Sequence, residues 1–139
     1  MKKLIISLLL YVSFSVLANQ NATEIDNRIV IELEQEQKVF VLLRMRKMLE
    51  TLTKMQVKLL EENLEATHDL ALELMRFTAK NHPDGLRERM PLPFRAMSQS
   101  MNKSWKKLSK KQTNSKVIQQ EIISIMSTCN ACHQSYRIE

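Results

Sequence analysis

The positions of glycine and proline limit most strongly what this chain can fold into. The sequence contains one glycine, Gly85, and its three prolines are Pro83, Pro91 and Pro93. These two residue types most often interrupt regular structure, so the long stretches on either side can form uninterrupted helices. Good helix formers dominate both stretches, and neither alternates apolar and polar residues as a half-buried strand does. The sequence therefore predicts an all-α fold.

Apolar residues recur at helical spacing in several segments. The clearest run alternates steps of four and three residues, which places one continuous stripe on a helix, and consists of Val41, Met45, Met48, Leu52, Met55 and Leu59. Less regular apolar positions precede it at Ile25, Ile29, Leu33 and Phe40. A second apolar face contains Leu70, Leu74 and Phe77. The last face contains Ile118, Ile122, Ile125, Cys129, Cys132 and Tyr136.

These segments divide the chain into four helices. A single helix over residues 38–80 would far exceed the roughly 8–20 residues usual in globular proteins, so we expect a turn near residues 61–63. The segment from Asn81 to Pro93 is predicted to be a loop. A third helix should run from near Pro93 to about Lys110, and a fourth should follow an N-cap at residues 113–115. Four amphipathic helices must bury their apolar faces against one another, which predicts an antiparallel four-helix bundle.

Residues 1–18 resemble a secretory signal peptide, with Lys2 and Lys3 before an apolar run and a small residue, Ala18, at the expected cleavage site. An uncleaved membrane anchor is the alternative, but the apolar run of 14 residues is shorter than the roughly 20 that span a bilayer. We therefore expect export without stable membrane insertion, and a single domain over residues 19–139. Removal of Lys2 and Lys3 with this segment would take the net charge from +6 to +4, which is too small to indicate nucleic-acid binding.

Cys129, Cys132 and His133 form a C-x-x-C-H motif near the end of the chain. On a helix, this spacing places all three side chains on one face, one turn apart. The motif is typical of c-type haem attachment, in which two thiols form thioethers with the haem vinyl groups and the histidine binds the iron. A zinc site would need four ligands, and a thioredoxin-type motif would need a βαβ context. The motif predicts one covalent haem c, with His133 as the proximal ligand.

An exported four-helix chain that ends in "CNACHQSYR" resembles the cytochrome c-prime family, the class II cytochromes c. The resemblance covers most of residues 38–139, and Tyr136 and Arg137 match the aromatic residue and arginine that follow the motif in that family. It implies a periplasmic haem protein of a Gram-negative bacterium. It also implies that Arg137, four residues beyond His133, lies beside the proximal imidazole on the same helix face. A surface cation near a helix C-terminus is the alternative role for Arg137.

The resemblance further implies that the first helix covers the other side of the iron, with Arg44 one turn before Met48. Met48 can bind the iron through its thioether, as in an electron carrier, or cover it as an apolar side chain and leave room for NO or CO. A methionine at a core position is also ordinary filler. Arg44 either pairs with a haem propionate or is solvated. Met45 and Met55 are the alternative candidates for the position over the iron. His68 and His82 are less favoured as iron ligands.

Eight cations and no carboxylate lie between Arg89 and Lys116. They predict either a docking face for an acidic redox partner or a solvated helix face. We expect a periplasmic electron carrier rather than an enzyme, because paired carboxylates, an activated nucleophile and a phosphate loop are lacking. The alternatives are a five-coordinate haem protein that binds small gases and, more distantly, a haem-free helical interaction protein with a Cys129–Cys132 disulfide. The sequence is also compatible with a homodimer.

Overall fold

The computed structural model describes residues 26–139, and the predicted signal peptide of residues 1–18 lies outside this range. In chain order the elements are β1 (Ile29–Ile31), α2 (Gln35–Leu60), α3 (Leu64–Asn81), α4 (Leu86–Arg89), α5 (Leu92–Leu108), α6 (Ser115–Ser135) and β2 (Tyr136–Ile138). Helices account for most of the described residues, so the predicted all-α class is confirmed. None of the helices in residues 26–139 combines the length and apolarity needed to cross a membrane.

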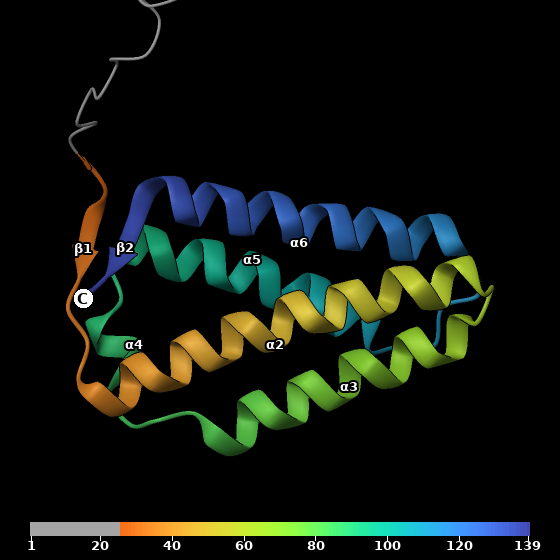
Figure 1. Ribbon diagram of the computed structural model, residues 1–139, viewed down its shortest axis with the longest axis horizontal. Helices are drawn as coiled ribbons and strands as arrows, with labels where there is room; N and C mark the ends of the chain where they lie inside the picture. The colour runs from red at the N-terminus through yellow and green to blue at the C-terminus, as the bar shows by residue number, and fades with distance from the viewer. Residues whose placement is uncertain (1–25) are drawn as a thin grey trace, which may run out of the picture.

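The four long helices lie side by side, and each runs antiparallel to the long helix before it (Figure 1). α2 packs mainly on α3 and α5 mainly on α6, with a smaller contact between α3 and α5. All four contribute to one buried core, which consists of Met48, Leu52, Met55, Ala71, Leu74, Met101, Trp105, Leu108, Ile118, Ile122 and Ile125. Met45 and Leu59 pack against this core, so the stripe predicted along residues 41–59 faces inward.

The helix boundaries agree closely with the predicted ones. α2 ends at Leu60 and α3 begins at Leu64, on either side of the predicted turn. The Asn63 side chain accepts a hydrogen bond from the Ala66 backbone N–H at 3.1 Å, and Asn114 accepts one from the Lys116 N–H at 2.9 Å. These caps satisfy amide groups that the first turn of a helix leaves without a partner.

The segment predicted as a loop, residues 81–93, contains the short helix α4. Gly85 precedes this helix with a φ of 69°, a left-handed conformation that glycine adopts without steric cost. The buried Gln37 side chain of α2 donates a hydrogen bond to the Asp84 carbonyl at 3.0 Å, which fixes the segment to the start of α2. Leu86 and Met90 are thereby buried in a second apolar cluster.

A two-stranded parallel sheet joins the two ends of the described chain, and no sequence pattern predicted it. The paired residues are Ile29 with Tyr136, Val30 with Arg137 and Ile31 with Ile138. The prediction that Tyr136 continues the apolar face of the last helix is wrong, because the backbone becomes extended there, with φ −134° and ψ 150°. Burial of Tyr136 beside Ile31 in the second cluster and the backbone pairing with β1 stabilise the extended conformation instead.

Candidate functional site

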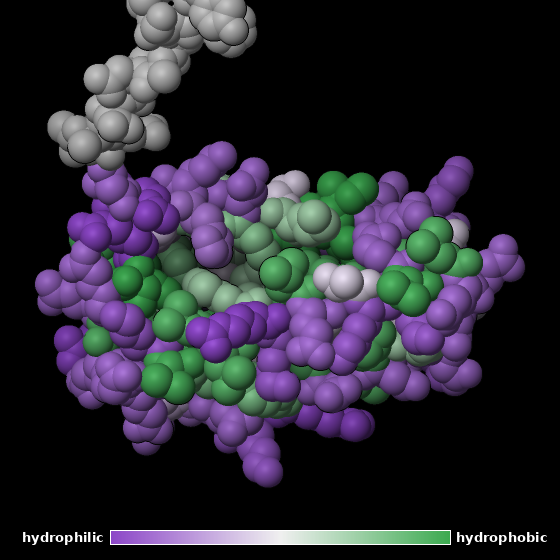
Figure 2. All heavy atoms as spheres, viewed as in Figure 1, coloured by the Kyte–Doolittle hydropathy of each residue, from purple (hydrophilic) through white to green (hydrophobic). Residues whose placement is uncertain are grey.

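A cavity of about 1190 Å³ opens at the seam between α2 and α6. Its lining residues come from α2, α5, α6 and the segment around α4, and many of them are apolar. Figure 2 shows the hollow with apolar side chains inside it and both polar and apolar side chains on its rim. Direct contacts between α2 and α6 are few, so the seam stays open. Cofactor and ligand pockets usually measure about 300–1,000 Å³, so this cavity is large enough for a cofactor.

The C-x-x-C-H residues lie on the α6 wall of the cavity. Cys129, Cys132 and His133 all line it, because they share one face of the end of α6. The Cys129 Sγ lies 4.0 Å from the Met101 Sδ, and the Cys132 Sγ lies 3.9 Å from the Met97 Sδ. Both thiols are free, and burial raises the pKa of each above its usual value. They are therefore neutral thiols at neutral pH.

Arg44 and Met48 lie on the α2 wall, one turn apart. Met48 is 6% exposed and belongs to the shared core as well. The Arg44 Nη2 donates to the Asn102 Oδ1 at 2.8 Å, whereas its buried Nε has no partner among the described residues. Burial lowers the pKa of the Arg44 guanidinium. The structure thus brings the two residues predicted on the first helix to the same cavity as the cysteines.

Arg95 of α5 is a lining residue that the sequence did not identify, because it falls within the run of cations. Its Nε is also buried without a partner among the described residues. A polar repeat at helical spacing could have signalled its position, since Arg95, Ser98, Gln99 and Asn102 all line the cavity. An unsatisfied buried donor costs about 1–3 kcal/mol. Two such guanidinium groups at one cavity favour a ligand that carries anionic oxygens, such as carboxylates or phosphates.

Arg137 does not share the face of His133, so that prediction is wrong. α6 ends at Ser135, and Arg137 belongs to β2, where it lies outside the described cavity lining. Its side chain forms ion pairs with Glu139 and, with 3.8 Å between Nε and Oδ2, with Asp26. The physical reason is the pairing of β2 with β1, which turns the backbone away from the helix before Arg137 is reached.

Only some of the other candidate iron ligands lie at the cavity. Met45 lines the cavity, whereas Met55 is fully buried in the core and lies outside the lining. His82 lines the cavity from the segment before α4, and its ring meets that of Phe40 edge to face, with 5.7 Å between centroids. His68 lies on α3, which contributes none of the described lining residues. Of the two histidines considered, His82 is the one at the cavity.

Several cations of the predicted docking face are paired within the chain. Side-chain ion pairs join Arg89 to Glu34 at 2.7 Å, Lys107 to Glu121 at 2.8 Å and Lys111 to Glu65 at 2.9 Å. Arg95 belongs to the cavity instead. These contacts reduce the positive charge available to a partner, and the acidic redox partner stays a prediction.

The cavity lining supplies two thiols, the imidazoles of His133 and His82, five thioethers and four guanidinium groups. In residues 26–139, no three His, Cys, Asp or Glu side chains are grouped so that they could hold a bare metal ion. No family model matches the chain, no curated protein is significantly similar to it, and no solved structure matches it significantly.

Proposed function

We propose that this chain is an exported mono-haem c-type cytochrome, similar to the cytochrome c-prime family, that carries electrons in the periplasm. The observation that supports this function most is that Cys129, Cys132 and His133 of α6 line the same cavity as Arg44 and Met48 of α2. The two groups lie in the last and first long helices, and both face one hollow of cofactor size.

The residues present fit a haem on chemical grounds. The largely apolar cavity suits a porphyrin ring, and thiols one helical turn apart can each form a thioether with one vinyl group. His133 of the α6 wall would bind the iron, and Met48 of the α2 wall is the candidate for a second ligand. Arg44 and Arg95 would donate to the propionate groups, which supplies partners for their buried Nε atoms. When bound, the haem supplies an iron that alternates between Fe(II) and Fe(III).

The absorption spectrum of the full chain, expressed with a haem-attachment system and exported, tests this function. We expect the bands of one c-type haem, which remain with the polypeptide after denaturation because thioethers are covalent. A chain that matures without haem would end the cytochrome proposal and favour the haem-free interaction protein.

Replacement of Met48 by leucine is expected to convert the haem from a low-spin to a high-spin spectrum. Leucine keeps the volume of a buried position, at a cost below about 1.5 kcal/mol, but it removes the thioether that would bind the iron. Visible spectra of the oxidised and reduced protein, with and without CO, measure the change. The reduced variant should bind CO readily.

Met45→Leu is the matched control, because Met45 lines the cavity one turn before Met48 without belonging to the buried core. Its spectrum should equal that of the wild type. A wild-type protein that binds CO without displacing a ligand, or a Met48→Leu variant with an unchanged spectrum, would contradict ligation by Met48. Either result would favour the gas-binding alternative.

Arg44→Gln and Arg95→Gln are each expected to weaken the binding of free haem by about 10- to 150-fold, because a hydrogen bond to a charged group contributes about 1.5–3 kcal/mol. Haem titration of chains in which both cysteines are serine, followed by the Soret band, measures the non-covalent affinity. Arg46→Gln is the control, since Arg46 is an exposed lining residue of α2, the helix that also contains Arg44. An equal loss in the Arg46 variant would mean that only the general positive charge matters.

A further inference from the structure

The N-terminal arm, residues 26–34, lies against the end of α6 that carries the C-x-x-C-H motif. β1 of the arm pairs with β2, so Ile29 lies opposite Tyr136, the first residue after α6. Two backbone hydrogen bonds of 3.2 Å, from the Leu33 N–H to the Glu139 carbonyl and from the Glu139 N–H to the Ile31 carbonyl, extend this ladder. The arm is therefore fastened to the chain that follows His133.

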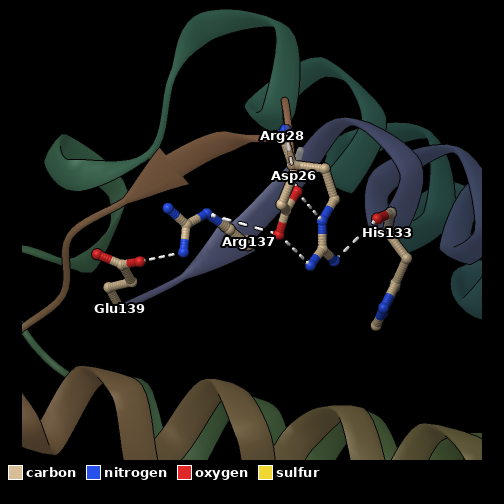
Figure 3. Close-up of polar contacts among 5 residues, drawn as sticks. All are labelled: Asp26, Arg28, His133, Arg137 and Glu139. Carbon is tan, nitrogen blue, oxygen red and sulfur yellow. Dashed lines mark hydrogen bonds and ion pairs between the residues drawn. The ribbon is translucent and has the colours of Figure 1, made fainter. Parts of the chain in front are cut away.

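Arg28 of this arm contacts the backbone of His133 (Figure 3). Its Nη1 donates to the His133 carbonyl oxygen at 3.3 Å. The last four carbonyl groups of a helix have no partner within it, and α6 ends at Ser135, so the His133 carbonyl is one of the four. Arg28 thus caps the helix end at His133, and its positive charge lies where the helix dipole favours a cation.

Asp26 fixes the orientation of the Arg28 guanidinium. The Asp26 Oδ1 accepts from the Arg28 Nε at 2.9 Å, and the Oδ2 accepts from the Nη2 at 2.7 Å. Such a two-point contact sets the plane of a guanidinium. The Asp26 Oδ1 also accepts from the Arg28 backbone N–H at 3.1 Å. In Figure 3, Arg137 lies beside this pair, with its guanidinium between the carboxylates of Asp26 and Glu139.

We propose that Arg28 is the residue that positions His133 and supplies a positive charge beside it, at the place where the resemblance puts Arg137. This role rests on the proposed function, because it concerns the iron that His133 would bind. A guanidinium held at the His133 carbonyl restrains the last turn of α6, from which the imidazole projects. If a haem is bound, this charge would favour Fe(II) over Fe(III), because a cation repels the more positive iron. Loss of Arg28 would also leave the Asp26 carboxylate unpaired.

The reduction potential of the matured protein tests the charge effect. Arg28→Gln should lower the midpoint potential, because it removes a positive charge beside His133 and leaves the Asp26 carboxylate unpaired. Arg28→Lys should restore part of this shift, because lysine keeps the charge but lacks the planar fork. Arg76→Gln is the control, since Arg76 is exposed on α3 and its loss changes the net charge equally. Potentials that are equal in the wild type and Arg28→Gln, or equal shifts in both glutamine variants, would overturn the role.

Hydrogen exchange of the haem-free full chain tests the positioning effect without relying on the cofactor. Arg28→Gln should speed exchange of the amides in the last turn of α6, whereas Arg76→Gln should not. Unchanged exchange in Arg28→Gln would overturn the capping role. A wild-type chain that acquires no haem would contradict only the proposed function, because the exchange experiment still tests the contact between Arg28 and His133.

Discussion

Replacement of both Cys129 and Cys132 by serine is expected to produce a chain from which all haem is extracted by acidified organic solvent. A serine hydroxyl is a much weaker nucleophile than a thiolate, so it forms no thioether with a vinyl group. Both positions would still line the cavity, and haem could bind there only non-covalently. A single replacement should leave one thioether. Haem staining after denaturing electrophoresis and the pyridine haemochrome spectrum measure the number of links.

Thr128→Ser is the matched control for this experiment, because it introduces serine at the position directly before Cys129. The Thr128 hydroxyl donates to the Ser124 carbonyl at 2.9 Å, and serine can make the same bond. This variant should keep a full complement of covalent haem. Covalent haem in the double serine variant would contradict the assignment of the two cysteines as tethers.

Ile122→Ala is expected to lower the free energy of unfolding by about 2–5 kcal/mol. Ile122 is 0% exposed and belongs to the core shared by the four long helices. Truncation removes buried apolar area and leaves a cavity that the surrounding side chains fill only in part. Urea unfolding followed by far-ultraviolet circular dichroism measures the loss.

Ile123 offers a control at the next position along α6, because its side chain is 62% exposed. Ile123→Ala should change the free energy of unfolding by no more than about 0.5 kcal/mol. Equal losses in the two variants would mean that α6 presents a different face to the core from the one observed.

The helices and the C-x-x-C-H motif were predictable because their determinants are local. Apolar periodicity reports on which face of a helix is buried, and the Asn114 cap acts within two residues of itself. The spacing of Cys129, Cys132 and His133 ensures that they share one face of any helix that contains them. Each of these features depends on neighbours within about one turn.

The rest of the cavity wall could not be predicted from the sequence. Arg95 lies in the cavity rather than on the cationic surface because of how α5 is rotated against α6. That rotation depends on the packing of side chains from all four long helices, which is a property of the whole core. The same packing brings Met45 to the cavity and leaves Met55 in the core, although both belong to one stripe.

By itself, the sequence determined which segments are helical and which side chains could tether a haem, because both depend on residues within a few positions of one another. Only the tertiary structure decided the surroundings of His133. Arg137 is close to His133 in sequence but is carried away by the strand that follows α6, whereas Arg28 is 105 residues distant and contacts its carbonyl. No local pattern reveals that Arg28, rather than Arg137, contacts His133, because this contact depends on residues from both ends of the described chain. Burial of Ile31 and Tyr136 in one cluster offsets the entropy of bringing these two ends together.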